Sequence, residues 1–326
     1  MMKLKFLFDN RDLTNMLLGN WAYDEKSLDM LKYYRISSNA VYPYQCEGKT
    51  RLLRFAPTSE KDINNLVAEL EFLRYLSYNQ FPALKTVLSN SGEELVTAQT
   101  PWGKYYATVF DRVAGVQIGD TDFNETIMYE YGRTLGKLHK LSSKFIPNSK
   151  RWSYEDVLFW INSTLSQLPN QEPAMKEIEL LHNYFSNIPK TQDTYGLVHY
   201  DFELDNVFYD KVTGVCNVID FDDAMYHWYV MDIEQALDSI KENIEPMKYE
   251  RSSEFFLNGY KSEYSVTYEM LSLRPVFRRF ANLYSYTRVA RASAEKWDNE
   301  PKWLIDLRVM LDNLMKSKLV SFDSKL

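Results

Sequence analysis

The chain has 326 residues, enough for two domains or for one unit with two lobes. Its 38 basic and 45 acidic residues give a net charge of −7, which argues against a non-specific nucleic-acid binder because such proteins are usually basic. Hydrophobic residues make up 45% of the chain, and the 11 glycines and 11 prolines are few. This composition predicts a globular protein built from long elements, mostly helices.

The cysteines and the apolar segments bear on the compartment. Cys46 and Cys216 lie far apart and show no metal-ligand spacing, so a disulfide framework is excluded and a reducing compartment is expected. The apolar stretch at residues 4–8 is too short for a signal-peptide core. No apolar run approaches the ~18 residues that span a bilayer. We therefore expect a soluble, cytoplasmic protein without membrane or nucleic-acid partners.

The first third of the chain predicts short strands around one helix. Residues 60–78 predict the helix, because their apolar side chains recur with the spacing i, i+3, i+4 and i+7. The strand candidates are rich in Tyr, Val and Leu. They are residues 33–36, 40–46, 50–55, 95–98 and 105–110.

The remainder of the chain reads mostly as helices. A capping-box pattern at residues 153–156 predicts the start of one helix. The other predicted helices are residues 127–141, 175–188, 274–291 and 302–319. Residues 196–223 interrupt them as a β-like island. We expect an N-terminal lobe at residues 1–111, a helical lobe at 112–326, and a ligand cleft at their joint.

The β-like island carries the residues with the clearest chemistry. The apolar segments 207–209 and 215–219 flank a turn and should pair as a hairpin. Pairing would bring Asn206 beside Asp220, and an amide oxygen with a carboxylate suits Mg²⁺. Asp201 lies five residues before Asn206, where it could orient or deprotonate a hydroxyl that attacks a phosphoryl group.

His199, Asp201 and Asn206, followed by Ile-Asp-Phe at residues 219–221, resemble the motifs of protein-kinase-like phosphotransferases. The pattern is most similar to the small-molecule branch, namely aminoglycoside phosphotransferases, choline kinase-like enzymes and homoserine kinase-like proteins. The resemblance implies an α+β, two-lobed fold with a five-stranded antiparallel N-lobe, one N-lobe helix, and a larger helical C-lobe with an embedded hairpin. It also implies that Asp201 is catalytic, that Asn206 and Asp220 bind metal, and that His199 orders the loop.

The resemblance extends to the nucleotide site, where ATP, or alternatively GTP, is expected. Arg54 resembles the basic residue that contacts phosphates, and Glu69 resembles its helical partner. The loop at residues 36–41 would cover the phosphates, and residues 110–113 would contact the adenine. The implied nucleotide-binding residues are Ser37, Ser38, Asn39, Arg54, Glu69, Phe110, Arg112 and Val113. The segment 229–232 is similar to one that carries a structural Asp.

Three features depart from the family pattern. Tyr200 replaces the usual small residue between His199 and Asp201. Arg54 stands where many relatives carry Lys, and the two side chains are not interchangeable. The loop at residues 36–41 has no glycine.

Charge is concentrated around the predicted site. Residues 201–245 hold twelve acids against Lys211 and Lys241. This window favours a cationic small-molecule acceptor, with Glu203, Asp222 and Asp223 as its predicted ligands. The arginines of the predicted helix 274–291 indicate either a phosphate or partner site, or a solvated face. They are Arg274, Arg278, Arg279, Arg288 and Arg291.

The leading hypothesis is an ATP- and Mg²⁺-dependent phosphotransferase that acts on a small-molecule hydroxyl. A protein Ser/Thr kinase is disfavoured, because Ala-Pro-Glu is absent and Tyr200 replaces the Arg of His-Arg-Asp. A catalytically idle kinase-like protein, as thought for some relatives in spore-forming bacteria, is opposed by the presence of Asp201, Asn206 and Asp220 together. The sequence leaves open the acceptor, the choice between ATP and GTP, and the oligomeric state.

Overall fold

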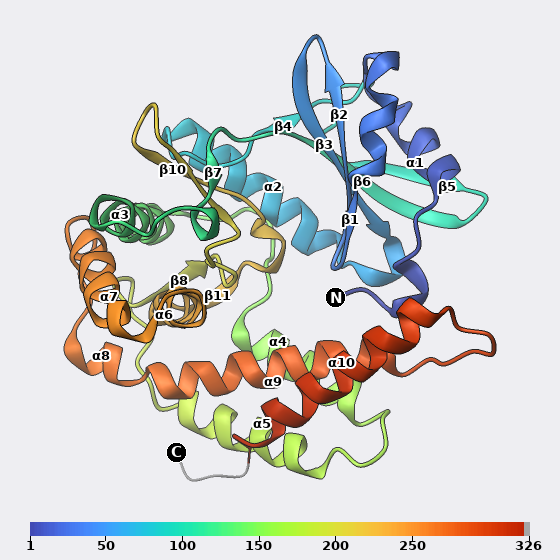
Figure 1. Cartoon of the computed structure of the whole chain (residues 1–326). Helices are drawn as coiled ribbons and strands as arrows, with labels where there is room; N and C mark the ends of the chain where they lie inside the picture. Colours follow the sequence, from blue (N-terminus) through green and yellow to red (C-terminus); the bar gives the residue numbers. More distant parts are fainter. Residues whose placement is uncertain (323–326) are drawn as a thin grey trace.

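The N-terminal part of the chain builds one antiparallel sheet, drawn in blue to teal at the top of Figure 1. The computed structural model describes residues 1–322. The strand order is β1-β2-β3-β6-β4, and β5 also pairs with β6. The strands are β1 (Arg35–Ile36), β2 (Ala40–Cys46), β3 (Lys49–Pro57), β4 (Thr86–Val87), β5 (Val96–Thr100) and β6 (Gly103–Asp111). Five strands were expected; the sixth, β4, is only two residues long, too short for a sequence pattern.

Two α-helices accompany this sheet where the sequence predicted one. The unpredicted α1 (Arg11–Leu18) buries Leu13 and Leu17 in the same apolar cluster as strand residues Tyr42 and Leu53. The predicted helix, α2 (Ile63–Tyr78), begins after Asp62, whose side chain accepts a hydrogen bond from a backbone N–H of the first turn. Helix α1 therefore packs in the apolar core of the sheet. Helix α2 runs from the sheet toward the helical lobe (Figure 1).

The C-terminal part is helical. Its helices are α3 (Glu125–Ser142), α4 (Tyr154–Leu165), α5 (Glu172–Phe185), α6 (Val230–Asn243), α7 (Pro246–Lys261), α8 (Tyr268–Ser272), α9 (Arg274–Ser293) and α10 (Lys302–Leu319). The capping box that opens α4 is confirmed, because Ser153 and Asp156 each accept from the other's backbone N–H. Helices α6, α7 and α8 were not predicted as such. None of the helices within residues 1–322 is long and apolar enough to cross a membrane.

Short strands carry the predicted hairpin. The additional strands are β7 (Val116–Gln117), β8 (Tyr195–Val198), β9 (Val207–Asp210), β10 (Val215–Val218) and β11 (Met225–Trp228). The hairpin is confirmed: β9 and β10 are antiparallel, and Val207 lies opposite Val218. Because the pair closes at this end, the residues just before β9 and just after β10 are held together.

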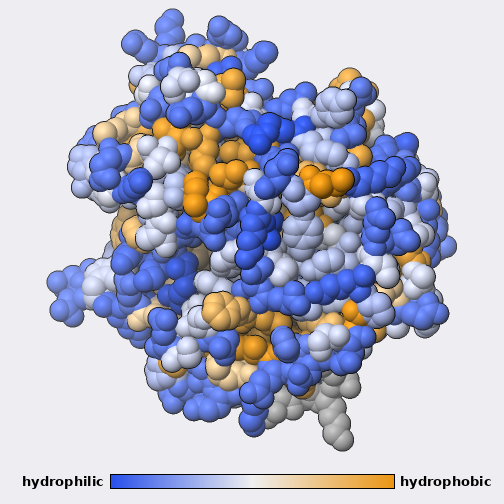
Figure 2. Space-filling view, turned by 180° about the vertical axis from the view of Figure 1, so that it is seen from behind, coloured by the Kyte–Doolittle hydropathy of each residue, from blue (hydrophilic) through white to orange (hydrophobic). Residues whose placement is uncertain are grey.

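The two lobes meet through apolar and polar contacts. Phe72 of α2 packs edge-on against Phe221, which follows β10, with ring centroids 6.0 Å apart. The Leu84 N–H also donates to the Val218 carbonyl. Strand β6 ends at Asp111, and the division of the chain at residues 111 and 112 stays a prediction. Seen from behind, the surface is mostly hydrophilic, with apolar residues gathered in separate patches (Figure 2).

Helices α3 and α7 pack at a distance that only glycine permits. A Cβ atom at Gly259 would lie 1.9 Å from the Tyr129 carbonyl oxygen, and one at Gly132 would lie 1.8 Å from the Phe256 carbonyl oxygen. Both clashes are with backbone atoms, so no side-chain rotation relieves them. The helices must move apart to accept even a methyl group.

We predict that Gly259→Ala and Gly132→Ala each lower the free energy of unfolding by more than about 2 kcal/mol, in the upper range for overpacking a core. Urea unfolding measures the change. Gly19→Ala is the matched control, since its Cβ would meet nothing closer than 3.5 Å. A stability of Gly259→Ala equal to that of the control would contradict the close packing.

Candidate active site

The loop after β8 is anchored by a buried carboxylate. The backbone N–H groups of His199 and Tyr200 donate to the two oxygens of Asp232, at 2.8 and 2.6 Å. Asp232 lies in the first turn of α6, and His139 Nε2 of α3 is 3.0 Å from it. All of these groups are buried. This network fixes the start of the loop, and it holds Tyr200 in a left-handed conformation, with φ of 70°.

His199 connects the loop to the hairpin. Its Nε2–H donates to the Ile219 carbonyl at 2.8 Å, and its Nδ1 accepts from the Asp201 backbone N–H at 3.2 Å. Both bonds require a neutral imidazole. Burial lowers the pKa of His199, although the charge of Asp232 opposes the shift. The geometry agrees with the loop-ordering role that the family resemblance implies.

The hairpin brings Asn206 next to the residue before Asp220, as predicted, and Asp201 of the same loop lies beside Asn206. The Asn206 side-chain amide donates to the Asp201 carboxylate at 2.8 Å and to the Asp201 carbonyl at 2.9 Å. The Asn206 carbonyl accepts from the Ile219 N–H at 3.0 Å, directly before Asp220. Because its N–H₂ group faces Asp201, Asn206 keeps its amide oxygen for another ligand.

The half-buried Asp201 and Asp220 give the site more negative charge than the protein itself neutralises. Burial and the charge of Asp222 raise the pKa of Asp220 to about 6, against the influence of Arg54. Burial, together with Glu203 and Asp223, raises the pKa of Asp201 well above its ordinary value, and Arg288 opposes this. A divalent cation would offset this charge, so the donor set fits a metal.

These residues suit a metal ion that also binds ligands from outside the protein. No group of three His, Cys, Asp or Glu side chains within residues 1–322 could form a complete cage. Mg²⁺ commonly takes one or two protein oxygens and completes its shell with water and phosphate oxygens. Asn206 and Asp220 provide such a pair of oxygens.

A cavity of about 470 Å³ lies between the lobes, and we call it the interlobe cavity. Apolar side chains from both lobes form part of its wall: Leu52, Leu84, Phe110, Phe208 and Ile219. Asn206 and Asp220 also line it. Most of the residues predicted to contact the nucleotide also line this cavity, namely Ser37, Ser38, Asn39, Arg54, Phe110, Arg112 and Val113. The structure thus gathers these residues around one space.

Glu69, the remaining predicted nucleotide residue, acts on Arg54. The guanidinium donates to both Glu69 oxygens, at 2.8 and 2.7 Å, and both side chains are buried. Arg54 also lies over the Phe110 ring, 4.8 Å from its centroid. The predicted strand-to-helix pair is present, and Arg54 of this pair lines the interlobe cavity.

A second cavity, of about 330 Å³, lies on the other side of Asp201. We call it the acidic cavity, because Asp201, Glu203, Asp238 and Glu242 line it together with residues of α9 and α10. Burial, with Asp205, Glu242 and Asp238 nearby, raises the pKa of Glu203 to about 7. Asp238 and Glu242 were not predicted as site residues. Their i, i+4 spacing within the acidic window was the available signal.

Asp222 and Asp223 do not line the acidic cavity, and the acceptor role predicted for them stays a prediction. Asp222 pairs with Lys61 and accepts from Asn39 at 3.1 Å. Asp223 pairs with Arg288 at 2.5 Å. Burial alone would raise both pKa values, but Lys61 lowers that of Asp222 and Arg288 lowers that of Asp223. Their charge is already neutralised within the protein.

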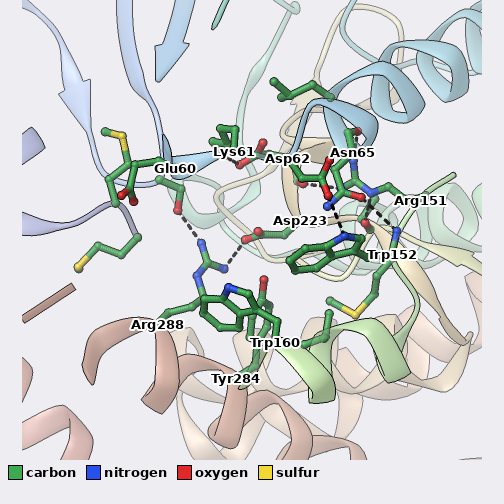
Figure 3. Close-up of a pocket in the computed structure, with 18 of the residues that line it drawn as sticks. Glu60, Lys61, Asp62, Asn65, Arg151, Trp152, Trp160, Asp223, Tyr284 and Arg288 are labelled. Carbon is green, nitrogen blue, oxygen red and sulfur yellow. Dashed lines mark hydrogen bonds and ion pairs between the residues drawn. The ribbon is translucent and has the colours of Figure 1, made fainter. Parts of the chain in front are cut away.

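Those two acids line a third cavity, of about 460 Å³, shown in Figure 3. Trp152 and Trp160 stand on one side, and Arg288 reaches Asp223 across it. Arg288 lines the acidic cavity as well.

The arginines of α9 are not a solvated face. Arg274 and Arg278 pair with Glu234, and Arg279 pairs with Glu177. Arg288 and Arg291 reach acids outside this group, Asp223 and Glu60. The helix therefore ties several elements together through ion pairs.

Known proteins of similar sequence and fold are kinases. Amicoumacin kinase from Bacillus subtilis (strain 168) is 27% identical over 274 residues, which cover 80% of each chain. A solved amicoumacin kinase in complex with AMP-PNP and Ca²⁺ superposes with a TM-score of 0.78 at 21% identity, covering 97% of this chain and 95% of the other. A microcompartment-associated aminopropanol kinase gives a TM-score of 0.71 at 18% identity, with 95% of each chain covered.

The structural likeness confirms the predicted kinase-like α+β fold. Residues 36–269 match the phosphotransferase enzyme family, more than two thirds of the chain. That segment includes the loop before β2, the anchored loop at residues 199–206 and the hairpin that carries Asp220. The predicted kind of protein, a small-molecule phosphotransferase, is confirmed at this level. The chain belongs to the phosphotransferase enzyme family.

Proposed function

We propose that this phosphotransferase uses ATP and Mg²⁺ to phosphorylate a hydroxyl group of a cationic small molecule. The observation that carries the proposal is the position of Asp201, Asn206 and Asp220. Asp201 lines the acidic cavity, Asn206 and Asp220 line the interlobe cavity, and a 2.8 Å hydrogen bond joins Asn206 to Asp201. A phosphoryl donor in one cavity and an acceptor in the other would meet at this bond.

The interlobe cavity suits a nucleotide. Bound ATP with Mg²⁺ would supply the phosphoryl group and reduce its negative charge. Apolar walls such as Leu52, Phe110 and Ile219 provide contacts for a base. Ser38 and Arg54 offer a hydroxyl donor and a positive charge for phosphates, and the oxygens of Asn206 and Asp220 are available to the metal. The AMP-PNP and Ca²⁺ in the related amicoumacin kinase support this assignment.

Asp201 is the proposed base for the acceptor hydroxyl. Its raised pKa makes it a stronger proton acceptor than an exposed carboxylate. Asn206 fixes its orientation. Asp201 would hold the hydroxyl proton at a carboxylate oxygen while the hydroxyl oxygen faces the phosphoryl group. Catalysis would then come mostly from positioning and from electrostatic stabilisation.

The acidic cavity favours an acceptor with an amino group. Glu203, Asp238 and Glu242 line it with Asp201. Arg278, a cation of the same wall, is paired with Glu234 and Asp238. The aminopropanol kinase among the structural neighbours is named for an amino alcohol, which supports this class of acceptor.

An activity assay distinguishes the proposed kinase from the alternative, a catalytically idle kinase-like protein. We predict that an amino alcohol or amino sugar stimulates ADP release by the wild-type protein. Asp201→Asn should then lower kcat by at least about 100-fold, the usual scale for a lost base. Its Kd for Mg·ATP should stay within a few-fold, because Asp201 contacts the acceptor and not the phosphates. Steady-state ADP release and titration calorimetry measure the two quantities.

Two outcomes would count against this assignment. If Asp201→Asn keeps the wild-type kcat, Asp201 is not the base. If Mg·ATP binds but none of the amines tested raises ADP release above the rate of the same variant, the idle alternative is favoured.

Asp220→Ala should weaken nucleotide binding in the presence of Mg²⁺ by at least about 10-fold. Mutating even a residue that only supports a metal ligand commonly lowers metal affinity or activity by about 10–100-fold. Asn206→Ala should cost less affinity, because water can replace a neutral ligand. Calorimetry with ATP, with and without Mg²⁺, compares the two. A larger effect of Asn206→Ala would reverse the proposed coordination.

Glu203 should make acceptor binding depend on pH. Because its pKa is raised to about 7, Glu203 gains its negative charge as the pH rises from 6 to 8. The KM of a cationic acceptor should therefore fall over this range, and Glu203→Gln should remove the fall. Two charges paired near a protein surface interact by ~4 kcal/mol, and we expect about a quarter of this energy to remain after screening. At pH 8 and low salt, the KM of the variant should therefore be roughly five-fold higher than that of the wild type.

Glu245→Gln is the matched control for this prediction. Glu245 belongs to the same acidic window but is exposed at the start of α7, where it pairs with Lys248 at 3.1 Å. Its KM should follow the wild-type dependence on pH. If Glu203→Gln and Glu245→Gln behave alike, the acidic cavity does not bind the cation through Glu203.

A further inference from the structure

One cation lies where the two proposed substrate cavities meet. Arg288 of α9 donates from Nη2 to the Ser38 hydroxyl at 2.6 Å and from Nη1 to Asp223 at 2.5 Å. Ser38 lines the interlobe cavity, and Arg288 lines the acidic cavity beside Asp201. The Arg288–Ser38 and Asn206–Asp201 hydrogen bonds therefore both cross the boundary that a transferred phosphoryl group must pass.

Two other cations near this boundary give their side-chain hydrogen bonds to carboxylates. Arg54 gives both of its terminal nitrogens to Glu69, and Lys61 is bonded to Asp222. Arg288 differs, because one of its two bonds goes to a neutral hydroxyl. A phosphate oxygen accepts a stronger hydrogen bond from a guanidinium than a hydroxyl does. The Ser38 contact is thus one that a phosphoryl group could replace, while Asp223 keeps the guanidinium in place.

The surroundings of Arg288 increase the effect of its charge. Its side chain is only 19% exposed, and the guanidinium lies over the Tyr284 ring at 5.2 Å. In phosphoryl transfer, negative charge spreads over three equatorial oxygens, and a fixed cation in a water-poor site stabilises it strongly. The planar fork of arginine can contact two of these oxygens at once.

We propose that Arg288 is a catalytic residue that contacts the transferring phosphoryl group, an inference that rests on the proposed kinase function. A bond forms between the acceptor oxygen and the γ-phosphorus. The bond from that phosphorus to the bridging oxygen breaks, and its electron pair leaves with ADP. The acceptor proton goes to Asp201. Arg288 donates N–H hydrogen bonds to the equatorial oxygens and exchanges no proton. This residue lies outside the family match, which ends at residue 269.

The competing explanation is that Arg288 only bridges the lobes. Arg291, about one turn along α9, provides a matched control for that role. It pairs with Glu60 at 2.6 Å, so it also joins α9 to the segment before α2, but it does not line the acidic cavity. A purely structural contribution should appear in both variants.

The experiment compares Arg288→Ala, Arg288→Lys and Arg291→Ala by melting temperature, kcat, and the Kd values of Mg·ATP and Mg·ADP. We expect Arg288→Ala to lower kcat by at least about 100-fold. This lower bound is set under the contribution of an arginine finger to kcat, which is about 10³–10⁵-fold. Arg288→Lys should recover only part of this loss. Millimolar guanidinium should partly restore kcat to Arg288→Ala. Arg291→Ala should keep kcat within three-fold at a similar loss of melting temperature.

Nucleotide binding tests the inference without any acceptor. Arg288→Ala should weaken Mg·ATP binding but leave Mg·ADP binding within two-fold, because only ATP carries the γ-phosphate. An unchanged ratio of the two Kd values together with a kcat equal to that of Arg291→Ala would overturn the inference. If the wild-type protein binds neither nucleotide, the kinase function itself fails, which is a distinguishable result.

Discussion

Half-buried carboxylates at the joint of the two lobes are the constraint on which the rest of the site depends. The pKa values of Asp201 and Asp220 are raised, because burial and neighbouring acids outweigh the opposing charges of Arg288 and Arg54. Neighbouring Asp222 and Asp223 are compensated, by Lys61 of the N-lobe and by Arg288 of α9. The protein thus neutralises the outer acids itself and leaves the inner pair for ligands. This division of charge keeps the lobes together and prepares the site for a cation and a hydroxyl.

The local backbone is organised to hold that inner pair. Asp232 fixes the loop before Asp201 through two N–H groups, and His199 ties the same loop to the end of β10. Asp220 adopts a left-handed conformation, with φ of 63°, that costs energy in a residue with a side chain. Tyr200, also left-handed, packs its ring against Tyr284 with centroids 5.5 Å apart. The departure at residue 200 thus links the loop to α9, the helix that carries Arg288.

The features that the sequence predicted are those set by local pattern. The β9–β10 hairpin follows from two apolar runs around a turn, and it places Asn206 beside the residue before Asp220. Asp238 and Glu242 were not predicted as site residues, and Arg288 was named only within a group of arginines for which a phosphate or partner site and a solvated face were both left open. Their positions depend on how α6 and α9 pack against the loop at Asp201, and Ser38 and Arg288 are 250 residues apart. The ion-pair partners of Asp222 and Asp223, which are Lys61 and Arg288, likewise come from distant elements.

The most direct test of the account is a crystal structure with AMP-PNP and Mg²⁺. We predict the base in the interlobe cavity between Leu52 and Ile219, and the metal on the oxygens of Asn206 and Asp220. The γ-phosphate should lie within hydrogen-bonding distance of Arg288, with Asp201 facing it from the acidic cavity. A triphosphate bound elsewhere, or one whose γ-phosphate points away from Asp201, would contradict the claim that phosphoryl transfer takes place between these two cavities.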